Sequence, residues 1–289
     1  MSFRLRRSKS LPREVKRAAR DELERVIEML VEPVQDSDES IHQLRVGMKR
    51  MRALLRLLRD VLGEETYRAE QQRCKALADD FAGFRDAAVA SALLDELLSG
   101  LPDPDLRIRI RAGFRGSPQV AAAASPGLDE ALQRLRLMRR AVREWPLDSL
   151  RRRQLKARLG RQYRRGLRLY GDVGEDTAMA LMHEWRKEVK RLLYQLELIR
   201  PEAGRTKVER RLKKLGSVLG DLHDLDMLEL QIESHPELFW LDDRLALRRR
   251  LRERRAALRE RALRLGGGIF AGSPAVFAQG RVAKWKAGH

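Results

Sequence analysis

Residues 41–50 read IHQLRVGMKR, and residues 182–191 read MHEWRKEVKR. Both stretches carry His, Arg, Lys and Arg at the same relative places. The matched pairs are His42 with His183, Arg45 with Arg186, Lys49 with Lys190, and Arg50 with Arg191. This repetition predicts a tandem duplication, in which two equivalent helices present the same polar residues to a common target.

A second pair of similar segments follows the first at nearly the same separation. Residues 84–86 (Phe-Arg-Asp) correspond to residues 222–224 (Leu-His-Asp). We therefore predict an all-α fold of two four-helix bundles related by pseudo-twofold symmetry. The expected divisions are a basic N-terminal tail at residues 1–11, a first helical half at 12–171, a second helical half at 172–280, and a C-terminal tail at 281–289.

Helical periodicity runs along nearly the whole chain, and no convincing strand alternation occurs. The stretch from Gly100 to Gly127 contains four prolines and is expected to be irregular. In the second half we expect separate helices at residues 205–220 and 222–233. Gly63 suits the end of the helix that carries the first repeat.

The charge balance points to anionic partners. The 289 residues include 61 Lys and Arg against 42 Asp and Glu, a formal net charge of +19. Such a field attracts nucleic acid, anionic membranes or inorganic polyphosphate. No stretch approaches the roughly 18 apolar residues that span a bilayer. The single cysteine, Cys74, excludes an internal disulfide, and no Cys/His cluster predicts zinc. We expect a soluble, cytoplasmic protein without a metal or cofactor.

A cationic stripe follows the first repeat helix. At 100° per residue, basic-type side chains fill a sector of about 80°, and apolar residues fill the opposite arc. No acid lies on this face to offset the repulsion between like charges four residues apart. A solvated face is the usual explanation of a charge run, but its recurrence in the second copy favours a ligand-facing role. The stripe residues are His42, Arg45, Lys49, Arg52 and Arg56, then His183, Arg186 and Lys190.

The second copy is less basic at its far end, where Leu193 and Glu197 stand in place of Arg52 and Arg56. Lys187 adds a charge beside its stripe. Other basic residues lie outside the repeats, and the additional contacts that we predict are Arg161, Arg164 and Lys214.

Arg50 and Arg191 fall inside the apolar arc rather than on the stripe. A buried guanidinium needs a carboxylate partner. The second repeated segment supplies one acid for each half, so we predict ion pairs between Arg50 and Asp86 and between Arg191 and Asp224.

The two repeated histidines allow several interpretations. Either could be a packed core histidine, and the two together could bind a metal, although no acidic ligands recur with them. Catalysis is disfavoured because no carboxylate or hydroxyl nucleophile accompanies His42 or His183 at helical spacing. An imidazole on a cationic edge can donate a hydrogen bond to phosphate and become protonated beside it.

These motifs resemble those of the CHAD family, the conserved-histidine α-helical domains. The likeness includes the two repeat helices, the segment at residues 84–86 and Leu-Gly-Asp-Leu-His-Asp at 219–224, and it spans about residues 12–280. The resemblance implies two four-helix bundles with a basic central groove or pore that binds inorganic polyphosphate. The family's basic positions carry over to His42, Arg45, Lys49, Arg52, His183, Arg186 and Lys190; Leu193 departs from the common Arg. The ExExK motif of the triphosphate tunnel domain, a frequent fusion partner, is absent, so a stand-alone member is expected.

Three functions follow from these observations. The preferred one is a polyphosphate-binding module, targeted to polyphosphate or associated with polyphosphate granules. The alternative is a nucleic-acid-binding helical protein, although aromatic residues are only 5% and sit mainly at apolar positions. An enzyme acting on phosphate anhydrides would need clustered metal-binding carboxylates, and the acids are scattered. We therefore expect a binding module without a catalytic set.

Overall fold

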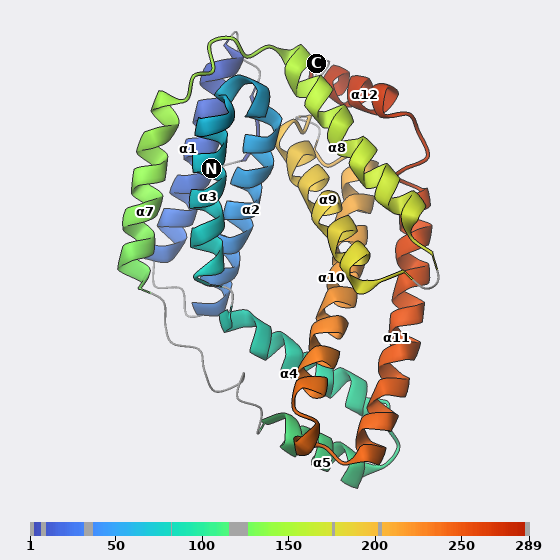
Figure 1. The fold of residues 1–289 in the computed structure, drawn as a ribbon. Coiled ribbons are helices and arrows are strands. Elements are labelled where there is room, and N and C mark those ends of the chain that lie inside the picture. Colours follow the sequence, from blue (N-terminus) through green and yellow to red (C-terminus); the bar gives the residue numbers. More distant parts are fainter. Residues whose placement is uncertain are drawn as a thin grey trace.

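The structure is a computed structural model that describes residues 3–6, 10–31, 37–81, 83–115, 127–174, 177–201 and 204–286, without the side chains of 37–38, 83–88 and 284–286. Throughout these ranges the regular elements are helices, and none is a strand, so the fold is all-α (Figure 1). The first part of the chain forms α1 (Leu11–Val31), α2 (Ser37–Leu62), α3 (Glu64–Asp79), α4 (Gly83–Ser99), α5 (Pro104–Arg115), α7 (Leu128–Ala141) and the 3₁₀ turn η1 (Val142–Glu144). The second part forms α8 (Arg152–Asp172), α9 (Met179–Leu198), α10 (Lys207–Ser234), the 3₁₀ turn η2 (Pro236–Leu238), α11 (Leu241–Gly267) and α12 (Pro274–Lys286).

The helices of the two repeats are direct neighbours. Helix α2 packs with α1 and α3, and α9 packs with α8 and α10 (Figure 1). Helices α2 and α9 also pack against each other. At this contact the buried side chain of Gln195 donates a hydrogen bond of 3.2 Å from Nε2 to the carbonyl oxygen of Ala53. The two repeated stretches therefore meet at the centre of the molecule.

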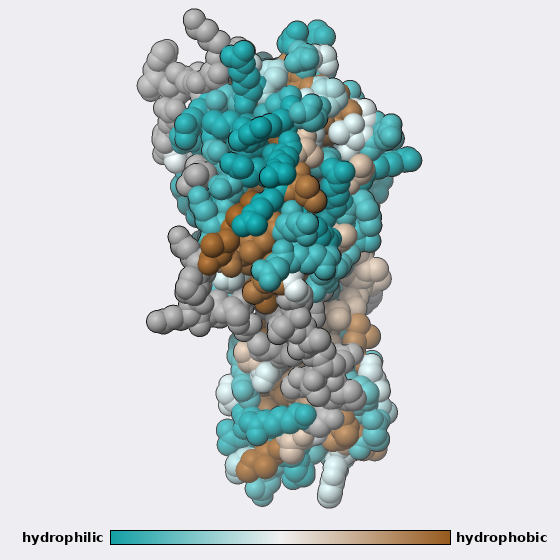
Figure 2. Space-filling view, turned by 90° about the vertical axis from the view of Figure 1, so that its left-hand side faces the viewer, coloured by the Kyte–Doolittle hydropathy of each residue, from teal (hydrophilic) through white to brown (hydrophobic). Residues whose placement is uncertain are grey.

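Helices α4 and α5 pack against the second part of the chain, on α10 and α11 (Figure 1). Arg109 of α5 pairs with the buried carboxylate of Asp243 on α11, with 2.8 Å between Nη2 and Oδ1. In the view of Figure 2 this end of the molecule forms a lobe narrower than the body above it.

Apolar periodicity explains which face of each repeat helix is buried. On α9 the fully or nearly buried residues Met182, Trp185, Val189, Leu192 and Leu196 recur every three or four positions. Burying one such aliphatic side chain contributes about 1.5–3 kcal/mol relative to leaving it exposed. Because this face is held in the core, the basic residues between these positions are carried toward one common side.

The turn between α2 and α3 confirms the expectation for Gly63. Its φ of 77° lies in the left-handed region, which glycine adopts without steric cost. The chain therefore reverses between α2 and α3 through a single residue.

Three expectations about the elements are corrected. Helix α10 runs unbroken through residues 207–234, because Asp221 and Leu222 continue the helical pattern. Helix α5 occupies part of the stretch expected to be irregular, whose residues 116–126 lie outside the described ranges. The tail boundaries also differ: Phe3 and Leu5 are buried, Leu5 N donates to Leu198 O at 2.7 Å, and α12 continues past residue 281.

Within the described part of the chain, none of the helices is both long enough and apolar enough to cross a membrane.

Candidate functional site

Basic side chains from α2, α9 and α10 gather near the contact between the two repeat helices. They lie close enough for their charges to influence one another. We call this group the central cluster; it consists of Arg45, Lys49, His183, Arg186, Lys187, Lys190 and His223. The structure thus brings together predicted residues from both repeats.

Two imidazoles of the central cluster face each other. The Nδ1 atoms of His183 and His223 lie 3.2 Å apart, and the ring centroids lie 4.4 Å apart. Burial lowers the pKa of His223 to about 4, helped by the neighbouring charges of Arg186, His183, Lys187 and Lys49. Burial also lowers the pKa of His183, together with Lys187 and Arg186. Both rings are therefore neutral near pH 7.

Two glycines let the cations of α9 lie directly on α10. A Cβ at position 216 would lie 3.1 Å from Cε of Lys190, which is tighter than ordinary contact. A Cβ at position 220 would lie 3.8 Å from Nε and Nη2 of Arg186. Gly216 and Gly220 are four residues apart, so they lie on one face of the helix. That face forms the surface on which Lys190 and Arg186 rest.

Arg186 and Lys190 are half-buried cations. Among the described residues neither of them forms an ion pair or a hydrogen bond, and Nε of Arg186 is fully buried without an acceptor. Burial lowers the pKa of both groups; Asp224 opposes this effect at Arg186, and Glu197 and Asp221 oppose it at Lys190. Half-buried charges that lack a partner are costly, and an anionic ligand would supply the missing counter-charge.

The predicted stripe residues of α2 also reach parts of the fold beside α3. His42 is half-buried and precedes Arg45 by one helical turn. Arg45 donates from Nη1 to the carbonyl oxygen of Phe81 at 3.3 Å. Arg52 donates from Nε to Oε1 of Gln71 on α3 at 3.2 Å. The stripe therefore extends from the central cluster toward α3.

Several predicted contacts lie outside the central cluster. Arg56 and Arg161 line a separate pocket between α2, α3, α8 and α9. Arg164 is exposed on α8. Lys214 is exposed and lines a hollow between α10 and α11 together with Arg211 and Arg261. The packing of the helices therefore separates these residues from the central cluster, although the sequence predicted one common site.

Arg50 and Arg191 have acidic partners that the sequence did not predict. Arg50 pairs with Glu22 of α1 and Glu197 of α9, each at 3.2 Å, because its side chain points toward these two buried acids. The side chain of Asp86 lies outside the described residues. Arg191 pairs with Glu188, one turn earlier on its own helix, and its pair with Asp224 stays a prediction.

His223 and Lys213 also lie in this region, and neither is among the site residues predicted from the sequence. Lys213 lies close enough to Lys190 to lower its pKa. A signal was present: residues 213, 216, 220 and 223 recur every three or four positions, so they share one face of α10. The two glycines and His223 therefore mark the side of α10 that meets α9.

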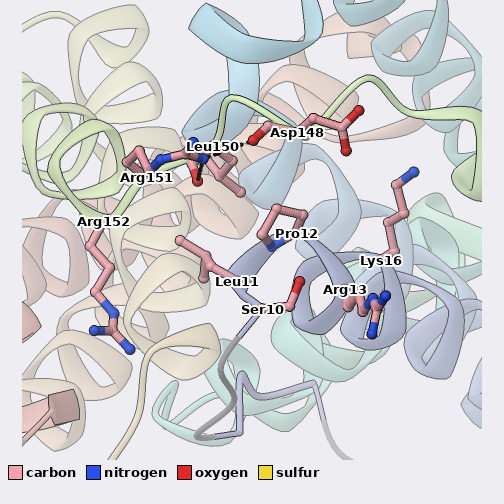
Figure 3. Close-up of a pocket in the computed structure, with 9 residues that line it drawn as sticks. All are labelled: Ser10, Leu11, Pro12, Arg13, Lys16, Asp148, Leu150, Arg151 and Arg152. Carbon is pink, nitrogen blue, oxygen red and sulfur yellow. Dashed lines mark hydrogen bonds between the residues drawn. The ribbon is translucent and has the colours of Figure 1, made fainter.

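A separate open cleft lies between the start of α1 and the segment that leads into α8 (Figure 3). Arg13, Lys16, Arg151 and Arg152 line it, and Nζ of Lys16 donates to the carbonyl oxygen of Arg143 at 2.7 Å. No residue of the central cluster lines this cleft.

Within the described ranges, no group of three or more His, Cys, Asp or Glu side chains is placed to hold a metal ion.

Comparison with known proteins identifies a family. The family model for the CHAD domain matches residues 14–230. The crystal structure of the CHAD domain from the plant Ricinus communis is similar over 99% of this chain and 97% of that chain, with a TM-score of 0.53 and 19% sequence identity. At this identity the likeness shows the fold alone. A comparison with curated proteins finds no match.

Proposed function

This chain belongs to the CHAD domain family, and we propose that it binds inorganic polyphosphate at the central cluster. One observation carries the proposal: Arg186 and Lys190 are half-buried next to further cations, and no described residue pairs with either of them. A protein that folds around such charges gains most from a ligand that brings its own negative charge.

Polyphosphate suits this arrangement chemically. Each internal phosphate carries about one negative charge, and the chain is thin, without bases that require stacking surfaces. Guanidinium groups bind phosphate oxygens through paired, charge-assisted hydrogen bonds, and ammonium groups act as compact positive charges. The central cluster offers both kinds of donor, with imidazoles close to them.

The geometry of the repeats supports a shared groove. Arg45 and Arg186 occupy equivalent places in the two repeats, and their charges lie close together. The hydrogen bond between Gln195 and Ala53 joins positions that are within one residue of being equivalent in the two repeats. We propose an approximate twofold axis between α2 and α9, with a basic groove along it.

The proposed role is binding rather than catalysis. The acids near Arg186 and Lys190 are Asp221, Asp224 and Glu197, and Glu197 already pairs with Arg50. We propose that the protein is targeted to polyphosphate, including polyphosphate granules in the cytoplasm. Incubation with Mg²⁺ and polyphosphate should release no phosphate beyond the buffer control; steady release would reverse this part of the proposal.

The binding test is a titration of long-chain polyphosphate by calorimetry at low salt, repeated between about 50 and 200 mM salt. We expect micromolar or tighter binding. The logarithm of the affinity should fall linearly with the logarithm of the salt concentration, by analogy with counterion release from nucleic acids. Absence of binding at micromolar concentrations in low salt would contradict the proposal.

A competition experiment separates polyphosphate from nucleic acid. Duplex and single-stranded DNA are added at the same phosphate concentration to the preformed polyphosphate complex. We expect little displacement, because the aromatic content is low and large aromatic residues such as Trp185 are buried rather than available for stacking. Full displacement would favour the nucleic-acid function.

A further inference from the structure

Arginines from two helices converge on a pocket that lies apart from the central cluster. Arg56 and Arg59 come from α2, and Arg158, Arg161 and Arg165 come from α8; we call these residues the arginine pocket. On α2, Ala53, which accepts the hydrogen bond from Gln195, separates Arg56 from the central-cluster residues Arg45 and Lys49.

The acids around the arginine pocket neutralise the charges of only some of its arginines. Asp60 accepts hydrogen bonds from Arg158, at 2.6 Å from Nε, and from Arg161 at 3.1 Å. Arg59 pairs with Glu64 at 3.0 Å, and its guanidinium lies 5.0 Å from the centre of the Tyr67 ring. Arg158, Arg161 and Arg59 therefore have carboxylate partners.

Arg56 and Arg165 differ from these neighbours. Neither forms an ion pair or a hydrogen bond with any residue that the structure describes. Glu188 lies near Arg56, but Arg191 and Gln162 already bind its carboxylate. Arg56 is half-buried, so water screens its charge only in part. Burial lowers its pKa, and the like charges of Arg191 and Arg165 lower it further.

The inner end of the pocket is closed. Gln162 and Gln195 line it, and these residues are only 4% and 2% exposed. A long chain therefore cannot pass between them, whereas a compact group at the solvent side can meet the guanidinium groups. Their planar forks match the oxygens of a phosphate group.

We propose that the arginine pocket is a second anion site, distinct from the central cluster, which takes a compact polyvalent phosphate group at its solvent side. The ligand would contact Arg56 and Arg165 directly and leave the Asp60 pairs in place. Anion binding at the arginine pocket does not require polyphosphate binding at the central cluster.

The test uses pyrophosphate as the probe, in calorimetric titrations of the full chain at low salt. The double variant Arg56→Gln/Arg165→Gln should lose at least about tenfold in affinity, the loss of a few charge-assisted hydrogen bonds. Arg168→Gln removes the same kind of charge from an exposed position on α8, where Asp172 lies 3.9 Å away, and should bind as wild type does. Arg186→Gln/Lys190→Gln should also keep its pyrophosphate affinity.

Thermal melts without ligand distinguish binding from a structural role. Removing Arg56 relieves repulsion from Arg191 and Arg165, so the double variant should melt at the wild-type temperature or above it. Unchanged pyrophosphate affinity in the double variant, or no wild-type binding at millimolar pyrophosphate, would overturn the second site. Loss of affinity only in Arg186→Gln/Lys190→Gln would place pyrophosphate in the central cluster and would also overturn it.

Discussion

His183 and His223 bring their Nδ1 atoms within 3.2 Å of each other on two packed helices, next to Arg186, Lys187 and Lys49. The pKa of both imidazoles is lowered in the free protein, that of His223 to about 4. A polyanion in the central cluster would favour the charged imidazoles and raise these pKa values. Binding should then take up protons, and affinity should increase as the pH falls from about 7.5 to 5.5, by about tenfold for one histidine restored to its ordinary pKa.

The measurement is the polyphosphate dissociation constant across this pH range, with proton uptake obtained from titrations in buffers of different ionisation enthalpy. His223→Asn should flatten the profile. His235→Asn changes a histidine that lies beside Glu237, at 3.3 Å, and should leave the profile unchanged. Equal affinity at both ends of the range would contradict the proposed coupling.

The same histidines predict how stability depends on pH without ligand. Their lowered pKa means that the unfolded chain binds protons first as the pH falls. Their contribution to stability is therefore complete above about pH 6.5 and declines toward pH 4. Urea unfolding at a series of pH values should show a shallower decline for His223→Asn than for wild type; parallel curves would exclude this contribution.

Gly216 and Gly220 offer a matched pair of substitutions in one helix. Alanine is favoured over glycine in a helix interior by about 0.8–1.0 kcal/mol. At position 220 the new Cβ makes ordinary contact with Arg186, so Gly220→Ala should be stabilised and should bind normally. At position 216 the new Cβ presses on Lys190, so Gly216→Ala should gain less stability and bind polyphosphate more weakly. Urea unfolding and titration check both; the reverse order in binding would contradict the placement of Lys190.

Arg50 holds two buried carboxylates together. The side chain of Glu22 has 0% exposure and that of Glu197 has 10%. Arg50→Met should reduce the free energy of unfolding by about 3 kcal/mol, the low end for a broken buried pair, because Arg25 and Arg200 remain beside these acids.

The control for Arg50 is Arg249→Met, which breaks a pair with Glu253 where the arginine side chain is 80% exposed. Its cost should stay below about 1 kcal/mol. Similar losses in the two variants would mean that the Arg50 pairs contribute no more than a surface contact.

The sequence predicted the all-helical fold and the basic residues of the two repeat helices, because apolar periodicity and in-register repetition are local signals. The contacts between helices that are distant in the sequence could not be predicted in the same way. Glu22 and Glu197 are partners of Arg50 that the sequence did not predict, because neither acid lies in a repeated motif. Arg56 shares a wheel sector with Lys49, yet α8 and α9 enclose it in another pocket. A helical wheel fixes the direction of a side chain and says nothing of the helix that it meets.

Cys74 gives a simple probe of global unfolding. It is fully buried, and burial raises the pKa of its thiol to about 12. A thiol-reactive dye should therefore leave the native protein unmodified at neutral pH and label it completely in urea. Rapid labelling in native buffer, with an unchanged helical spectrum, would contradict the burial of this residue.

The most direct test changes the charges of the central cluster and measures the affinity for long-chain polyphosphate. The test variant carries Arg45→Glu, Lys49→Glu, Arg186→Glu and Lys190→Glu. A control with the same net charge carries Arg153→Glu, Arg168→Glu, Arg249→Glu and Arg252→Glu, all at exposed positions. We expect both variants to keep a helical spectrum, the control to bind, and the cluster variant to show no binding. A folded cluster variant that binds polyphosphate as tightly as the control would contradict the central claim.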